Sequence, residues 1–158
     1  MNEYDSGSGA RSQKRNVRHS LDDKIQYSLR AEEQLLQSIS SHASLPKVLN
    51  EISSALDFQI GNVVSLITLP GDDPSELAAT AMNAAQFGLH TFCSEGITAE
   101  NDELLGFLEV YCSVPREPTA EEAELIERAK CLAAIAIKQN EASQGARKRV
   151  VEWPDSKN

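Results

Sequence analysis

The side chains with the strongest intrinsic chemistry in this chain are three thiols, Cys93, Cys112 and Cys131. A thiolate is a good nucleophile and metal ligand. None of the three belongs to a Cys-x-x-Cys pair, and the few histidines do not cluster with them at metal-site spacing. Cys93 follows no helix start and has no cluster of cations beside it in the sequence. We therefore expect reduced, packed thiols and neither a metal nor a cofactor.

Glu109 and Tyr111 are the polar side chains best placed to recognise a ligand. They alternate along a predicted strand, so both point to the same face of a sheet. Glu109 either faces solvent at a sheet edge or binds a ligand amine or an arginine of a partner. The candidate ligand-binding set, drawn from mixed strand faces, is Leu66, Phe92, Phe107, Glu109 and Tyr111.

The composition favours one globular domain. The 158 residues suffice for a single core, which Leu, Ile, Val and Ala must build because aromatics make up only 5%. The whole chain carries a net charge of −9. Residues 1–20 and 138–158 each carry a net charge of +2, so the body over residues 21–137 carries −13. Such an acidic body disfavours nucleic acid and anionic membranes as partners. The chain has neither an apolar run long enough for a membrane span nor a signal peptide, and we expect a cytoplasmic protein.

The first half of the chain predicts helices around one strand. A narrow apolar stripe over Leu21–Ile39 is typical of a coiled-coil seam. Ser44 caps a second helix, whose apolar residues repeat at helical spacing over Leu45–Leu56. Ile60–Leu69 is apolar on both faces, as an interior strand is. The stretch from Asp73 to Gly88 predicts a short helix with a proline in its first turn and a glycine stop.

The second half predicts two strands and a long helix. The strands are Leu89–Ile97 and Leu104–Tyr111, joined by a polar loop. Gly106, inside the second strand, indicates a bulge or a close approach of another backbone. On that strand, alternation predicts Leu104 and Leu108 on one face. A Thr-x-x-Glu capping box at Thr119 begins a helix that we expect to end at Gln139.

This order of elements resembles the C-terminal half of a GAF domain, in the version that precedes bacterial sensor kinases and diguanylate cyclases. GAF domains are sensor and dimerisation modules of signalling proteins. The resemblance covers about a third of the chain. The motifs that carry it most specifically are Phe87-Gly88-Leu89 leading into Ser94-Glu95, then Leu104-Leu105-Gly106, then Pro115-Arg116-x-Pro118-Thr119-x-Glu121 and the helix after it.

The resemblance implies an α+β fold, with a small antiparallel sheet, helices packed on it, and long N- and C-terminal helices. The chain departs from the family between the first helix and Pro74, where a full GAF domain has a further hairpin and helices. Those segments wall the usual ligand pocket. We therefore predict a disordered arm over residues 1–18, one truncated GAF-like domain over 19–141 and a flexible tail over 142–158. Because a sheet of three strands leaves its edges unpaired, a strand of another subunit can add to it.

Three functions from different classes remain open. The first is a non-catalytic regulatory module that dimerises through Leu21–Ile39 and Leu125–Ile137 and contacts a signalling protein. The second is a small-molecule sensor with a working pocket and an unknown ligand. The third is a thiol-dependent enzyme of the free-methionine-sulfoxide-reductase type that uses Cys93 or Cys112, although the glycine-rich loop pattern of those enzymes is absent. No set of nucleophile, base and oxyanion donors is recognisable, which favours the first.

Overall fold

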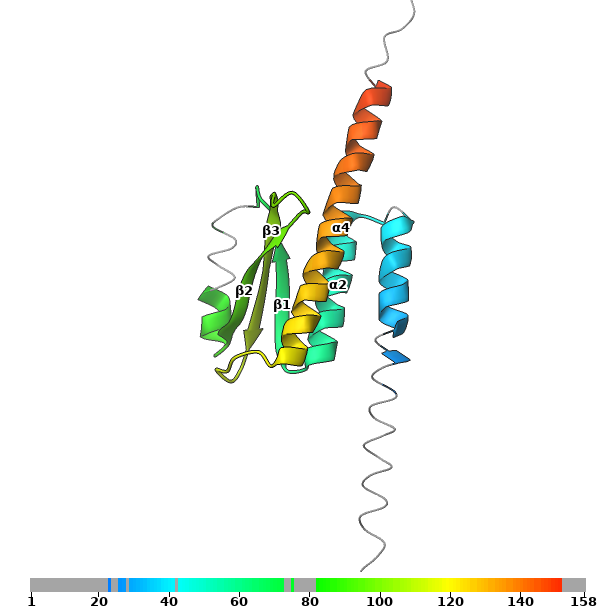
Figure 1. Ribbon diagram of the computed structural model, residues 1–158. Coiled ribbons are helices and arrows are strands. Elements are labelled where there is room, and N and C mark those ends of the chain that lie inside the picture. The colour runs from blue at the N-terminus through cyan, green and yellow to red at the C-terminus, as the bar shows by residue number, and fades with distance from the viewer. Residues whose placement is uncertain are drawn as a thin grey trace, which may run out of the picture.

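The computed structural model describes residues 23, 26–27, 29–41, 43–72, 75 and 82–151, with side chains as far as Arg147. The elements in order are a helix over 29–40 (the N-terminal helix), α2 Leu45–Ile60, β1 Val63–Thr68, a short helix over 82–86, β2 His90–Thr98, β3 Leu104–Cys112 and α4 Ala120–Val151. In Figure 1, α2 and α4 form a layer beside the sheet, with the N-terminal helix on the far side of that layer. The short helix lies beside β2, away from α2 and α4.

The three strands form one antiparallel sheet in the order β1-β3-β2. The middle strand, β3, buries Leu108 and Val110 completely beneath the helices. Ile60–Leu69 was predicted as an interior strand, which is wrong in two respects. Ile60 is the last residue of α2, and β1 lies at an edge of the described sheet. Its apolar character on both faces comes from packing against α2 on one side and from half-buried Leu66 on the other.

Two local details of the strands and caps also differ from expectation. Leu104 is 46% exposed, whereas Leu105 is 3% exposed and belongs to the core, because the register shifts between Ile97 and Thr98 on the neighbouring strand. Ser44 occupies the N-cap position of α2, but its side chain makes no capping hydrogen bond. Its carbonyl accepts the first helical bond, from the Val48 N–H.

The core is one cluster between the sheet and the helices. From α2 it takes Val48, Leu49, Ile52 and Leu56, which recur at helical spacing. From α4 it takes Ile126, Ala129, Ala133, Ala136 and Ile137. The small alanines let α4 lie close to its neighbours. The N-terminal helix contributes Leu35 and Ile39, so this helix is docked on the layer of α2 and α4.

The long C-terminal helix extends further than its sequence predicts. α4 continues to Val151 instead of ending at Gln139, and Figure 1 shows it projecting beyond the sheet. Residues such as Ala142, Gln144 and Ala146 are good helix formers, and the weakest helix former of this stretch is Gly145, which costs about 1 kcal/mol relative to alanine. The tail expected from residue 142 is therefore helical as far as Val151.

Several predictions fall on residues outside the described ranges. These are the arm over 1–18, the residues beyond 151, Leu21 and Ile25 of the first stripe, and the Asp73-Pro74 helix start. Gly88, the predicted helix stop, has a φ of +70° and follows the short helix, as expected. Within the described ranges, no helix is both long and apolar enough to cross a membrane.

Gly106 provides a sharp test of the packing between β1 and β3. A Cβ added at Gly106 would lie 2.5 Å from the backbone oxygen of Thr68 on β1, whereas one added at Gly145 meets nothing within 4 Å. We expect Gly106→Ala to lower the free energy of unfolding by about 1–3 kcal/mol, because a backbone atom must move. The matched variant Gly145→Ala should leave stability unchanged or raise it by up to about 1 kcal/mol. Urea denaturation followed by circular dichroism measures both, and an unchanged midpoint for Gly106→Ala would contradict the close approach.

Candidate functional site

Four of the five predicted ligand-binding residues share one face of the sheet. The register places Leu66 opposite Glu109, Thr68 opposite Phe107 and Val64 opposite Tyr111. Since Leu108 and Val110 point to the helices, their neighbours Phe107, Glu109 and Tyr111 point the other way. We call the side of the sheet that carries Leu66, Phe107, Glu109 and Tyr111 the outer face.

Phe92, the fifth predicted residue, is not part of the outer-face group. It lies at a register shift of β2 between Thr91 and Cys93, is buried, and belongs to the core cluster. The guanidinium carbon of Arg116 lies 4.7 Å from the centroid of its ring. Phe92 therefore anchors the loop before α4 through a cation–π contact. Nothing in the sequence indicates this contact, because a bulge changes the side to which a side chain points.

Glu109 and Tyr111 form the polar centre of the outer face. The Tyr111 hydroxyl donates a hydrogen bond of 2.9 Å to Glu109 Oε2. Burial and the neighbouring Glu109 carboxylate raise the pKa of Tyr111 to about 12, because both disfavour the tyrosinate. The hydroxyl thus stays protonated at neutral pH and holds a half-buried carboxylate in a fixed orientation. Such a carboxylate can accept a hydrogen bond from an amine or a guanidinium.

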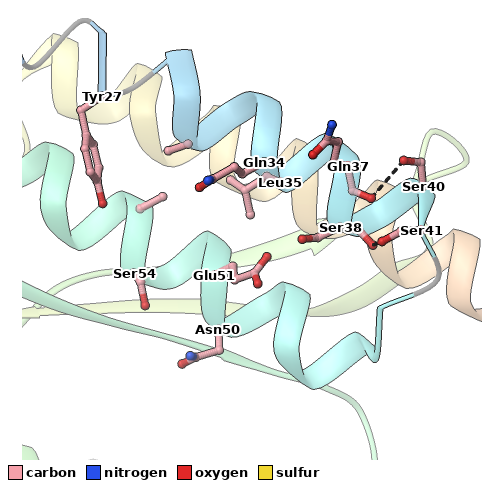
Figure 2. Close-up of a pocket in the computed structure, with 12 residues that line it drawn as sticks. Tyr27, Gln34, Leu35, Gln37, Ser38, Ser40, Ser41, Asn50, Glu51 and Ser54 are labelled. Carbon is pink, nitrogen blue, oxygen red and sulfur yellow. Dashed lines mark hydrogen bonds between the residues drawn. The ribbon is translucent and has the colours of Figure 1, made fainter.

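A separate groove of about 650 Å³ lies between the N-terminal helix and α2 (Figure 2). Its walls are mostly amide and hydroxyl side chains, with Tyr27 at one end; among them are Gln34, Gln37, Ser38, Asn50, Glu51 and Ser54. Figure 2 shows Gln34 and Leu35 on one helix and Glu51 and Ser54 on the other. On this side the N-terminal helix meets α2 mostly through polar groups, so its attachment depends on the apolar contacts of Leu35 and Ile39 and on Tyr27, whose ring centroid lies 4.0 Å from that of Phe58 on α2.

The three thiols occupy different environments. Burial, with a smaller effect of Glu95, raises the pKa of Cys93 to about 11. Cys112 is buried and its thiol donates to the Val114 carbonyl at 3.0 Å. Cys131 is exposed on α4. In the part of the chain that the structure describes, no three His, Cys, Asp or Glu side chains lie close enough to hold a metal ion.

Ionic contacts at several points along α4 fix it to the rest of the molecule, and those of Glu122 and Lys130 are the shortest to Arg116 and to the sheet. At its start, the predicted capping box forms: the Thr119 N–H donates to Glu122 Oε2 at 2.9 Å, and the Glu122 N–H donates to Thr119 Oγ1 at 3.2 Å. Arg116 donates two bonds of 2.7 Å to the same carboxylate and, with burial opposing it, lowers the pKa of Glu122 to about 2. Further along, Lys130 Nζ lies 2.7 Å from Glu95 on β2. Local spacing predicts the first contact, whereas nothing in the sequence indicates the second.

Comparison with solved structures identifies the architecture. The chain is similar to the GAF domain of a phosphoenolpyruvate-protein phosphotransferase from Acinetobacter, with a TM-score of 0.52 and 11% sequence identity. The match covers 75% of this chain and 98% of the solved one. This chain has a GAF-like fold. The predicted fold class, a small antiparallel sheet with helices packed on it, is confirmed. No protein-family model and no curated protein matches the sequence.

The thiol environments predict selective labelling. At pH 8, a pKa of about 11 leaves roughly one Cys93 in a thousand as the thiolate. We expect a thiol reagent to modify exposed Cys131 quickly and Cys93 at least roughly 100-fold more slowly, with the Cys93 rate rising as pH increases. Stopped-flow absorbance with a disulfide reagent measures these rates. Cys131→Ser should remove the fast phase, and a second fast phase that disappears in Cys93→Ser would contradict the burial of Cys93.

Proposed function

We propose that this chain is a non-catalytic, GAF-like regulatory module that acts in the cytoplasm through dimerisation and contact with a signalling protein. The observation that carries the proposal is a second apolar stripe on the N-terminal helix. Leu35 and Ile39 on one side of that helix are buried against α2 and α4. Leu29 and Leu36, seven residues apart, are 62% and 51% exposed on another side. A seven-residue repeat of leucines on a free helix side is typical of a helix that pairs with another.

The position of α4 supports the same surface. In Figure 1 the N-terminal helix and α4 run in the same direction. Glu32 and Arg128 form an ion pair of 3.9 Å between them. Leu36 follows Glu32 by one helical turn, and Ile135, which is 52% exposed, follows Arg128 by two turns. Leu36 and Ile135 therefore lie within about one helical turn of each other on adjacent helices, and together they offer apolar surface to a second copy.

Most of the apolar face of α4 serves the core of its own domain. Ile126, Ala133 and Ile137 are buried against the sheet and α2. The predicted dimer surface on Leu125–Ile137 is thereby reduced to side chains such as Ile135. Beyond the sheet, the projecting part of α4 carries an exposed helical surface on which a partner can bind.

The alternative is a small-molecule sensor, and one observation favours it. The hydrogen-bonded Glu109–Tyr111 pair lies on the outer face beside Leu66 and exposed Phe107. Apolar walls with a few converging polar groups are typical of ligand sites. A reductase that depends on Cys93 has less support, because such chemistry needs a thiolate and burial raises the pKa of that thiol to about 11.

The dimer proposal predicts a loss of assembly in a double variant. Leu29→Glu with Leu36→Glu places two charges on the proposed interface, and we expect the dimer dissociation constant to rise about 30-fold or more. Sedimentation equilibrium at micromolar concentration measures it. The control is Gln34→Glu, which adds a charge on the same helix but in the polar groove facing α2. A wild-type chain that stays monomeric at high concentration would sink the proposal.

The sensor alternative predicts a specific thermal shift. A screen over nucleotides, amino acids and aromatic acids should give no large shift if the chain works by contact alone. A ligand at 100 times its dissociation constant would stabilise the native state by about 2.7 kcal/mol. A reproducible shift of that size, lost in Glu109→Ala but kept in Glu117→Ala, an exposed carboxylate outside the outer face, would make the sensor the better description.

A further inference from the structure

In the described part of the chain, a groove runs along the unpaired edge of β1, next to α2. In the described sheet β1 is an edge strand, with β3 on its inner side. A cavity of about 310 Å³ lies between β1 and α2. One wall is a helical stripe of α2, formed by Leu49, Asn50 and Ser53, and the other wall includes Ser65 and Ile67. Asp72 lies at its end. A groove between an edge strand and a helix is a recurring site for binding an extended peptide.

The backbone of β1 presents hydrogen-bonding groups along this groove. The Leu69 N–H donates to Asp72 Oδ2 at 2.6 Å, and the Ser65 backbone bonds to the Asp57 carboxylate. N–H directions alternate along a strand, so the N–H groups of Ser65, Ile67 and Leu69 face the same edge. Among the described residues, no backbone group pairs with Ile67 on that edge. The free edge is therefore centred on Ile67 and has a carboxylate at each end.

The charges around the groove select its occupant. Asp57 and Asp72 bracket the free edge, and the body of the chain carries a net charge of −13 over residues 21–137. A basic segment complements these carboxylates. A second β1 does not, because antiparallel pairing of two β1 strands would bring Asp57 of one copy towards Asp72 of the other. Like charges across an interface disfavour that pairing.

We infer that the groove between β1 and α2 binds an extended, basic segment of a partner protein by strand addition, with backbone bonds at Ile67 and ion pairs at Asp57 and Asp72. This inference deepens the proposed function, on which it rests, by giving the contact with a partner a place and a chemistry. Apolar side chains of the segment pack on Leu49 and Ile67, and basic side chains reach Asp72, which lines the groove, and half-buried Asp57 beyond its lining. The two carboxylates also occupy edge N–H groups in the free chain, which limits pairing with unsuitable strands.

A labelled peptide tests the site. The probe is a capped heptapeptide of alternating lysine and valine, and its control replaces lysine with glutamate. Fluorescence anisotropy with the full chain should give a dissociation constant on the order of 100 µM for the lysine peptide and no binding of the glutamate peptide. Asn50→Tyr, which fills the groove, should abolish binding. Ser54→Tyr, on the side of α2 facing the N-terminal helix, should leave it unchanged.

Two further comparisons separate strand addition from simple charge attraction. Asp72→Asn keeps an acceptor for the Leu69 N–H but removes the charge, and should weaken binding about threefold to tenfold. Two further peptides carry backbone N-methyl groups, one at its valines and the other at its lysines. They differ in which of the two edges of the peptide strand can no longer donate hydrogen bonds. One should bind and the other should not, because alternate N–H groups point to one edge. Equal affinity of the two peptides would overturn strand addition.

Other outcomes have defined meanings. Failure of the lysine peptide to bind overturns the inference, as does binding that Asn50→Tyr leaves intact. A chain whose dimer mass is lost in Asn50→Tyr but kept in Leu29→Glu with Leu36→Glu has a second copy in the groove, which also overturns it. If the dimer depends on Leu29 and Leu36 and no peptide binds, the strand-addition site is refuted while the proposed function stands.

Discussion

The structure depends on complete burial of the helix-facing side of β3. Leu108 and Val110 are fully inaccessible to solvent, and they lie between two edge strands and a layer of two helices. A three-stranded sheet is stable only if one face is covered by other elements. α2 supplies leucine and isoleucine for this purpose, whereas α4 supplies isoleucines separated by alanines. Because β3 passes close to β1 at Gly106, where a side chain would collide with the Thr68 carbonyl oxygen, the sheet also favours a glycine near the start of its middle strand.

Burial of β3 uses most of the apolar surface of the helices. Some apolar side chains on the helices and the sheet remain exposed. The core takes Leu35 and Ile39 from the N-terminal helix and most of the apolar face of α4. The large apolar side chains that remain exposed include Leu29, Leu36, Phe58 and Ile135 on the helices, and Val64, Leu104 and Phe107 on the sheet. The helices and the edge of β1 therefore offer separate contact surfaces. A module that dimerises through one and binds a partner through the other would not need a deep ligand pocket.

The candidate site was predictable in part. Alternation along a strand was enough to place Glu109 and Tyr111 on one face, and the pairing register adds Leu66 and Phe107. Alternation failed at Leu105 and assigned no face to Phe92, since both lie at register shifts that only the pairing of two particular strands produces. The edge position of β1 was also missed, because an edge strand packed against a helix has the same apolar composition as an interior strand.

Local chemistry determined several features of this chain by itself. The capping box at Thr119 and Glu122, the glycine stop at Gly88 and the helical spacing of α2 all follow from contacts within a few residues. The length of α4 was misjudged, since a polar composition is compatible with both a solvated helix and a coil. Only the tertiary structure decided which apolar residues remain exposed, that Lys130 meets Glu95, and that Asp57 and Asp72 bracket the edge of β1. These contacts join elements that are distant in sequence or turn on which edge of the sheet is open, and neither is encoded in the spacing of neighbouring residues.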